Sequence, residues 1–143
     1  MFYKCAGLTA APKLPATILV EDCYDYMFAE CTGITAAPEL PAMTLAESCY
    51  DSMFEGCAGL TVAPKLPATV LANECYKWMF DGCTSIKLSE TQIDEYQIEY
   101  RIPTSGVGTD ATNALTSMFD GTGGTFTGTP SINTVYYTSN AVV

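Results

Sequence analysis

The sequence predicts an α/β solenoid of about five coils, each with one short parallel strand and one helix. The first observation is a 26-residue repeat, in which the pattern MFxxCxGLTxAPxLPAxxLxxxCYxx starts at residues 1, 27 and 53. A unit of this length cannot bury its own apolar side chains, so consecutive units must stack. The second observation is that each unit has an apolar-periodic half and a proline-marked half, for which different structures are expected.

The apolar-periodic half predicts an amphipathic helix. When each residue from 19 to 31 is advanced by about 100°, one half-circle collects the apolar residues, which are Leu19, Cys23, Tyr24, Met27, Phe28 and Cys31. Glu21, Asp22 and Asp25 fall on the opposite side. We therefore expect a helix whose acidic face lies in solvent.

The proline-marked half, residues 8–14 in the first unit, predicts a short strand that enters a Pro-Ala turn and stacks in parallel. Proline cannot donate a ladder hydrogen bond, so the paired part is expected to span about three or four residues. Lys13, Glu39 and Lys65 share one repeat position. Stacking in register would place them about 5 Å apart in the order plus, minus, plus. This alternation of charge either favours stacking in register, or the three residues are solvated charges that have no effect on stability.

We expect a single repeat domain over residues 1–143, with regular repeats in 1–78, an expanded coil in 79–117 and a C-terminal capping coil in 118–143. In the expanded coil, alternation of Ile98, Tyr100 and Ile102 with polar residues predicts a strand followed by a loop. Residues 89–92 predict the start of a short helix, and residues 110–119 predict a return of the repeat's helix. The first repeat has no polar cap, so we expect the chain to be a fragment of a longer array.

The charge balance bears on the class of partner. The chain has 16 acidic and 6 basic residues and a net charge of −10, which repels phosphate backbones and anionic lipid surfaces. Nucleic acid is therefore not an expected partner. With no run of 18 apolar residues, membrane insertion is not expected either.

The seven cysteines do not indicate a metal site, because the chain has no CxxC motif and no histidine. On a helix, Cys23 and Cys31 would lie about 12 Å apart, beyond the bridging limit of about 7 Å. Cysteines at one repeat position in adjacent coils could approach each other. Two interpretations stay open, buried reduced thiols and disulfides between coils, and the first is favoured because Ala114 and Thr122 fill the same positions in the last coil.

The motifs MFxxCxxL, LPAxxL and CYxxMF together resemble the BspA-like leucine-rich repeats of bacterial cell-surface proteins. The resemblance covers residues 1–86 closely, whereas residues 87–143 share only the pair Met118-Phe119 and the general length. It implies a leucine-rich-repeat type of solenoid without catalytic residues. It also implies a cell-surface or secreted location and a role in adhesion or in binding host proteins.

No catalytic, cofactor or metal site is expected, because the acidic clusters lack a partner base, a nucleophile or calcium-loop spacing. The expected function is adhesion or protein–protein interaction by a non-enzymatic module, and the partner is a protein, such as a host extracellular protein. A carbohydrate-binding module and a purely structural spacer are the alternatives, and self-association through the uncapped first coil is a further expectation. The candidate contact residues are Tyr26, Trp78, Tyr96, Tyr100, Arg101, Ser105 and Val107.

Overall fold

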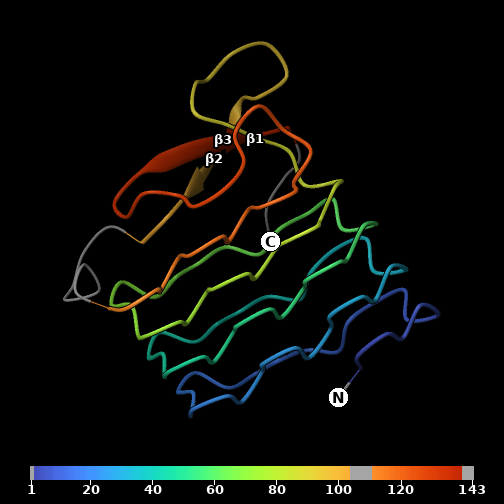
Figure 1. Ribbon diagram of the computed structural model, residues 1–143, viewed down its shortest axis with the longest axis vertical. Helices are drawn as coiled ribbons and strands as arrows, with labels where there is room; N and C mark the ends of the chain where they lie inside the picture. Colours follow the sequence, from blue (N-terminus) through green and yellow to red (C-terminus); the bar gives the residue numbers. More distant parts are fainter. Residues whose placement is uncertain (1, 104–110, 140–143) are drawn as a thin grey trace.

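The chain forms a stack of layers, one for each repeat, in a computed structural model that describes residues 2–103 and 111–139 (Figure 1). Equivalent aromatic rings of successive repeats lie on top of one another, for example Phe28 on Phe54 with ring centroids 5.6 Å apart and Tyr50 on Tyr76 at 5.8 Å. The 26-residue period therefore corresponds to one layer, and the apolar side chains of each layer are buried by its neighbours.

The apolar-periodic half of each repeat is a series of overlapping turns, which we call the turn ladder (residues 19–31, 45–57, 71–83 and 111–122). Within a layer, the backbone N–H of Asp25 donates to the carbonyl of Asp22 at 3.3 Å. Between layers, the N–H of Tyr24 donates to the carbonyl of Cys49 at 3.1 Å. The same pair of bonds repeats over residues 22–31, 48–57 and 74–83, where odd residues bond within the layer and even residues bond to the next layer.

Every fourth residue of the turn ladder has a positive φ. In the first segment of the ladder, residues 19–31, they are Asp22 (φ 55°), Tyr26 (φ 52°) and Glu30 (φ 57°), and Gly56 and Gly82 continue the third position. A positive φ at the third residue of a four-residue turn is the conformation of a type II turn. The backbone thus reverses its direction locally at regular intervals without forming a helix.

The expected α/β solenoid of the leucine-rich-repeat type, with one helix per coil, is therefore wrong. The described residues contain no helix, and their three strands form a single antiparallel sheet. The error has a physical reason. Apolar residues at i, i+4 and i+8 drift by only about 40° per step on a helical wheel, so a four-residue period resembles a helix face over 13 residues.

The proline-marked segments are extended but form only isolated parallel bridges, Ile18 with Thr44 and Ala36 with Val62. The strand expected over residues 8–14 is not present, and neither are its equivalents in the next two repeats, all of which lie in the described part of the chain. The prolines account for this difference, because each removes an N–H that a continuous ladder would need.

A small antiparallel sheet closes the C-terminal end of the stack (Figure 1). It contains β1 (Leu88–Ser89), β2 (Ile98–Arg101) and β3 (Val135–Thr138) in the order β1-β3-β2. The strand expected around residue 100 is confirmed as β2. The helix expected from residue 89 is wrong, because Ser89 lies in β1 and its Oγ accepts the N–H of Thr91 at 3.1 Å. The helix expected over 110–119 is also wrong for residues 111–119, which are turns, whereas residue 110 lies outside the described part.

The seven cysteines are free, and five of them are buried. Three of the buried thiols, those of Cys31, Cys57 and Cys83, connect layers by hydrogen bonds, as in Cys83, whose Sγ donates to the carbonyl of Phe54 at 3.0 Å. The exceptions are Cys5 and Cys23, which are exposed because they belong to the first layer. The reduced-thiol interpretation therefore agrees with the structure, and a small polar side chain can take the same position, as Thr122 does.

Candidate partner-binding groove

Three clefts follow one another along the proline-marked side of the stack. The largest measures about 570 Å³, the next about 210 Å³ and the third about 270 Å³. The first two share Glu39 and Pro41, and the last two share Lys65 and Pro67. We call this run of clefts the groove; its lining residues are Ala11, Lys13, Leu14, Pro15, Pro38, Glu39, Leu40, Pro41, Lys65, Leu66, Pro67, Glu99, Tyr100 and Arg101.

Prolines at one repeat position, Pro15, Pro41 and Pro67, line the groove in successive layers. Each proline ring fixes φ near −65° and therefore restricts the extended segment that carries it. The neighbouring leucines are buried, Leu14 and Leu66 among them. The groove is thus formed by a restrained backbone whose apolar side chains are anchored in the core.

Charges of alternating sign lie along the groove. Lys13, Glu39 and Lys65 are exposed in successive layers, and Glu99 and Arg101 of β2 continue the series. No ion pair joins any of these five residues to one another. Within residues 2–103 and 111–139, the ion pairs within 4.0 Å are Lys4 with Glu30 and Lys77 with Glu74. The repeats stack in register, as expected. The charged side chains do not pair with one another across the layers, so they are available to a partner.

Tyr100 joins the C-terminal sheet to the repeat stack beside the groove. Its side chain is buried, and its hydroxyl donates to the carbonyl oxygen of Pro64 at 2.7 Å. Burial raises the pKa of Tyr100 well above the ordinary value, so this hydroxyl keeps its proton. The bond fixes β2, and with it Arg101, relative to the third layer.

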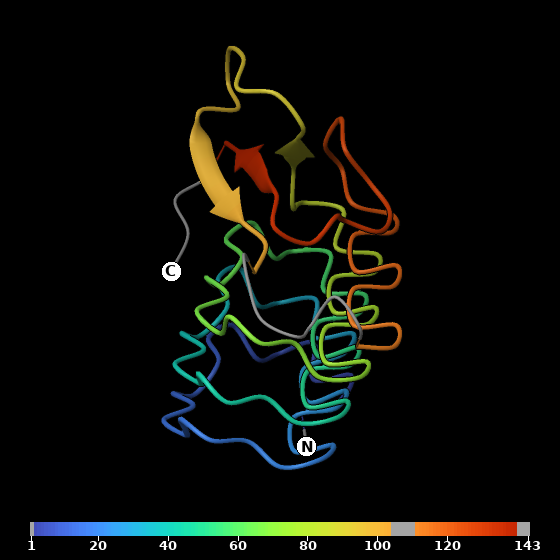
Figure 2. The same cartoon turned by 90° about the vertical axis from the view of Figure 1, so that its left-hand side faces the viewer.

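The residues predicted from the sequence as partner contacts do not converge on one site. Tyr26 and Trp78 belong to the turn ladder, which lies on the opposite side of the stack from the proline-marked segments (Figure 2). Tyr96 is buried, with 8% of its surface exposed, so it does not offer a contact surface. Of the five predicted contact residues that the structure describes, Tyr100 and Arg101 line the groove, and of these two Arg101 has the exposed side chain. Ser105 and Val107, like the rest of the predicted contact loop over residues 104–109, lie outside the described residues.

Three residues that line the groove, Lys13, Glu39 and Lys65, are not among the partner contacts predicted from the sequence. Their shared repeat position was the available signal, but it indicated a surface ladder and not the wall of a groove. The prolines that surround them were interpreted only as limits on strand length. A charged residue between two prolines in each of the three regular repeats is the feature that marks the groove.

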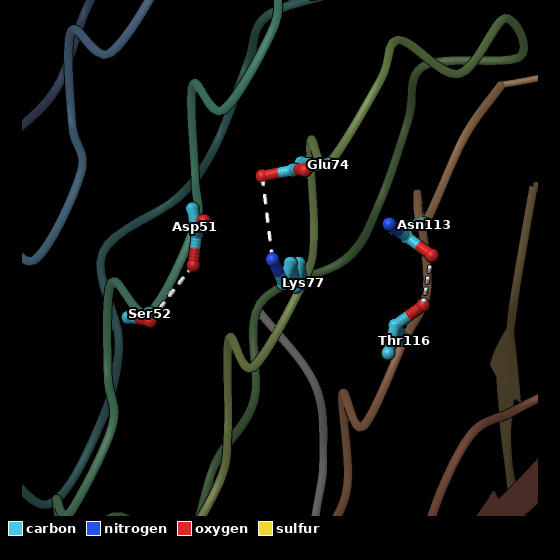
Figure 3. Close-up of polar contacts among 6 residues, drawn as sticks. All are labelled: Asp51, Ser52, Glu74, Lys77, Asn113 and Thr116. Carbon is cyan, nitrogen blue, oxygen red and sulfur yellow. Dashed lines mark hydrogen bonds and ion pairs between the residues drawn. The ribbon is translucent and has the colours of Figure 1, made fainter.

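The exposed aromatic residue Trp78 is partly covered by its own neighbour. The Nζ of Lys77 lies 4.5 Å from the centre of the Trp78 ring, and the same nitrogen forms an ion pair with Glu74 at 3.4 Å (Figure 3). A cation held over the ring is attracted by its π electrons. It also occupies a face on which a sugar ring would stack.

Polar side chains on the turn ladder pair mostly within their own layer (Figure 3). Ser52 donates to Asp51 at 2.8 Å, and Thr116 donates to Asn113 at 3.3 Å. Asp25 differs because one of its carboxylate oxygens is buried without a recorded partner. Burial, followed by the nearby charges of Asp51 and Asp22, raises the pKa of Asp25 to about 6.

Three other carboxyl groups of the turn ladder, those of Asp51, Glu55 and Asp81, also have raised pKa values. Burial is the main cause for Asp51, where a hydrogen bond from Ser52 opposes the shift, and for Glu55 and Asp81. Among the residues that the structure describes, no three cysteine or carboxylate side chains are placed to hold a metal ion. The group on this side that can take up a proton close to neutral pH is therefore the carboxyl group of Asp25.

The described residues include no helix that could cross a membrane. Comparison of the chain with protein-family models, with curated proteins and with solved structures gives no match. The groove and the contacts around it are therefore the basis on which function is proposed.

Proposed function

We propose that this chain is a non-catalytic protein-interaction module whose groove binds an extended segment of a partner protein. The observation that supports the proposal is the run of three clefts that share walls and carry unpaired charges of alternating sign, Lys13, Glu39 and Lys65. A partner segment with acidic, basic and acidic side chains in that order would pair with each of them. Such complementarity contributes mainly to specificity and to the association rate.

The restrained backbone of the groove favours binding of this kind. A preformed site loses little conformational entropy when a partner binds, and this lowers the free-energy cost of association. Pro15, Pro41 and Pro67 restrict the extended segments, and Tyr100 fixes the end of the groove through its bond to Pro64.

We propose adhesion at a cell surface, or after secretion, as the setting, as the BspA-like motifs imply, with an extracellular protein as the partner. Carbohydrate binding ranks second for two reasons. Lys77 occupies a face of the Trp78 ring, and the buried Ser52 lies at the same repeat position in the layer between Tyr26 and Trp78. A structural spacer would offer no saturable site on the groove.

Selection of displayed random peptides on the immobilised chain tests the proposal. We expect the enriched peptides to carry the charge order acidic, basic, acidic. The Lys13→Glu/Lys65→Glu variant should bind them at least tenfold more weakly. Lys87→Glu is the control, because it reverses the charge of an exposed lysine outside the groove, and its affinity should stay within twofold of the original. Peptides that bind the double variant as well as the original chain would contradict the proposal.

A further inference from the structure

The first layer has an open face, formed by residues 2–26, on which backbone acceptors lie unused. In the second layer, the carbonyls of Glu47, Cys49 and Asp51 accept the N–H groups of Asp22, Tyr24 and Tyr26 at 3.0–3.1 Å. The equivalent carbonyls of the first layer belong to Glu21, Cys23 and Asp25. None of these three carbonyls accepts a hydrogen bond from the part of the chain that the structure describes.

Side chains on the open face are exposed where their equivalents in inner layers are buried. Cys23 is exposed, whereas Cys49 and Cys75 are 0% exposed. The glycines of the repeat show the same difference. A Cβ built on Gly59 would lie 2.5 Å from the carbonyl oxygen of Thr32 in the preceding layer, whereas a Cβ on Gly7 meets nothing within 4 Å. The open face therefore has the shape and the acceptors of a surface that normally receives another layer.

The opposite end of the stack is closed by the chain itself. The N–H of Phe119 donates to the carbonyl of Gly128 at 3.0 Å, and the N–H of Ser117 donates to Oγ1 of Thr129 at 2.9 Å. A second copy of this chain could therefore meet the open face only with the carbonyl acceptors of its own open face or with its closed C-terminal end. Two open faces placed together would oppose carbonyl to carbonyl, and such groups cannot form hydrogen bonds with each other.

We infer that the open face binds the donor edge of another layer of this repeat type. Such an edge has free N–H groups at every second residue of the sequence xxCYxxMF, spaced to reach the carbonyls of Glu21, Cys23 and Asp25. Its Tyr and Phe rings would continue the two aromatic columns that now begin at Tyr24 and Phe2. This inference concerns a different surface from the groove, and the two can fail separately.

The test adds one layer to the complete chain. A second copy of residues 27–52, with its cysteines replaced by alanine, is placed before Met1, and the control carries the same 26 residues in scrambled order. Iodoacetamide labelling of Cys23 is followed by mass spectrometry. We expect the added layer to slow labelling at least tenfold and the scrambled segment to leave it unchanged.

A Gly7→Ala substitution supplies a second readout. In the original chain it should leave the melting temperature unchanged, because the space beside Gly7 is empty. In the extended chain it should lower the melting temperature by several degrees, because the new methyl group would meet the added copy of Thr32. Cys23 labelling that the added layer does not slow, or a Gly7→Ala effect that is equal in both chains, would overturn the inference. A concentration-dependent dimer of the original chain that protects Cys23 would overturn it too, by showing that a second copy occupies the face.

Discussion

The thiol of Cys57 donates a hydrogen bond to the carbonyl oxygen of Phe28, 3.0 Å away in the preceding layer. That carbonyl also accepts the backbone N–H of Cys31 at 3.1 Å, so the thiol supplies its second bond. Cys83 makes the same contact with Phe54. The cysteines at this repeat position therefore connect layers as protonated thiols, which makes their ionisation relevant to stability.

We expect the free energy of unfolding to fall as the pH rises above about 9. Burial raises the pKa of Cys49, Cys57 and Cys75 from 9.0 to about 12 each. Below pH 9 these thiols are protonated in both states. Above it they ionise only in the unfolded chain, which stabilises that state until the pH reaches the folded pKa.

Urea unfolding at several pH values between 8 and 11 checks this prediction. Cys57→Ala should reduce the slope of stability against pH, whereas Cys5→Ala, at an exposed cysteine, should leave it unchanged. Equal slopes for the original chain and Cys57→Ala would show that this thiol is ionised in the folded protein.

Asp25 should make the protein more stable in mild acid than at neutral pH. Its folded pKa of about 6 lies above the ordinary value of 3.8, so the folded state binds a proton more tightly than the unfolded state. The resulting stabilisation is fully present below pH 3.8 and is lost as the pH rises through 6. Asp25→Asn should raise the urea midpoint at pH 7 and reduce the change in midpoint between pH 4 and 7. An unchanged midpoint at pH 7 would contradict the proposed burial of this carboxylate.

Ser48 and Ala46 distinguish the turn ladder from a helix. Ser48 has a φ of 53°, whereas Ala46 has no positive φ. A left-handed conformation costs a non-glycine residue about 1–2 kcal/mol, and glycine loses about 0.5–1 kcal/mol more chain entropy on folding. Ser48→Gly should therefore stabilise the protein by about 0.5–1 kcal/mol, and Ala46→Gly should destabilise it by a similar amount. In a helix both substitutions would destabilise, so denaturant unfolding of the two variants separates the structures.

Gly59→Ala should destabilise the protein by about 1–3 kcal/mol, as expected for a methyl group forced into a packed site. The added Cβ would lie 2.5 Å from the backbone carbonyl oxygen of Thr32, which can move only if a layer shifts. Gly33→Ala, with its Cβ 2.5 Å from the carbonyl oxygen of Ala6, should behave in the same way. Thermal unfolding measures both, and similar melting temperatures for Gly59→Ala and the original chain would contradict the spacing between layers.

Removal of the Tyr100 hydroxyl should lower the free energy of unfolding by about 1 kcal/mol. It deletes one buried hydrogen bond and leaves the carbonyl of Pro64 without that partner. Tyr100→Phe keeps the ring, which packs edge-on against Phe119 with centroids 6.2 Å apart. Chemical denaturation gives the cost, and hydrogen exchange of the β2 amides should increase. Tyr137→Phe in β3 is a comparison on the same sheet. Unchanged stability and exchange in Tyr100→Phe would show that this hydroxyl does not fasten the sheet.

The stacking of repeats could be predicted from the sequence because equivalent residues require equivalent environments. Phe28, Phe54 and Phe80 are 26 residues apart and form one column. The turn ladder could not be separated from a helix by apolar spacing alone. The discriminating signal lies at every fourth position, which holds glycine at 56, 82 and 121, together with Asp22 and Asn113. These residue types tolerate a positive φ better than most.

The site was less predictable because it depends on contacts that are distant in the sequence. Alternation around Tyr100 predicted a strand but not its partner β3, whose paired residue Tyr136 is 36 positions away. The bond from Tyr100 to Pro64, which spans a similar distance, has no local signal either. The position of Lys13 and Lys65 in one column was visible, but their place on a groove wall depends on how the prolines direct the extended segments.

The direction of the bonds between layers gives the stack an electrical polarity. The peptide unit between Asp25 and Tyr26 has its N–H directed to the carbonyl of Asp51, so its own oxygen is directed toward the open face. The peptide unit between Asp51 and Ser52 is aligned in the same way, with its N–H directed to the carbonyl of Lys77. Aligned peptide dipoles add, as they do in a helix. Here the negative pole lies at the N-terminal end, the reverse of a helix, and the carboxylates of Glu21 and Asp22 reinforce it, so this end of the molecule should attract positively charged groups in solution.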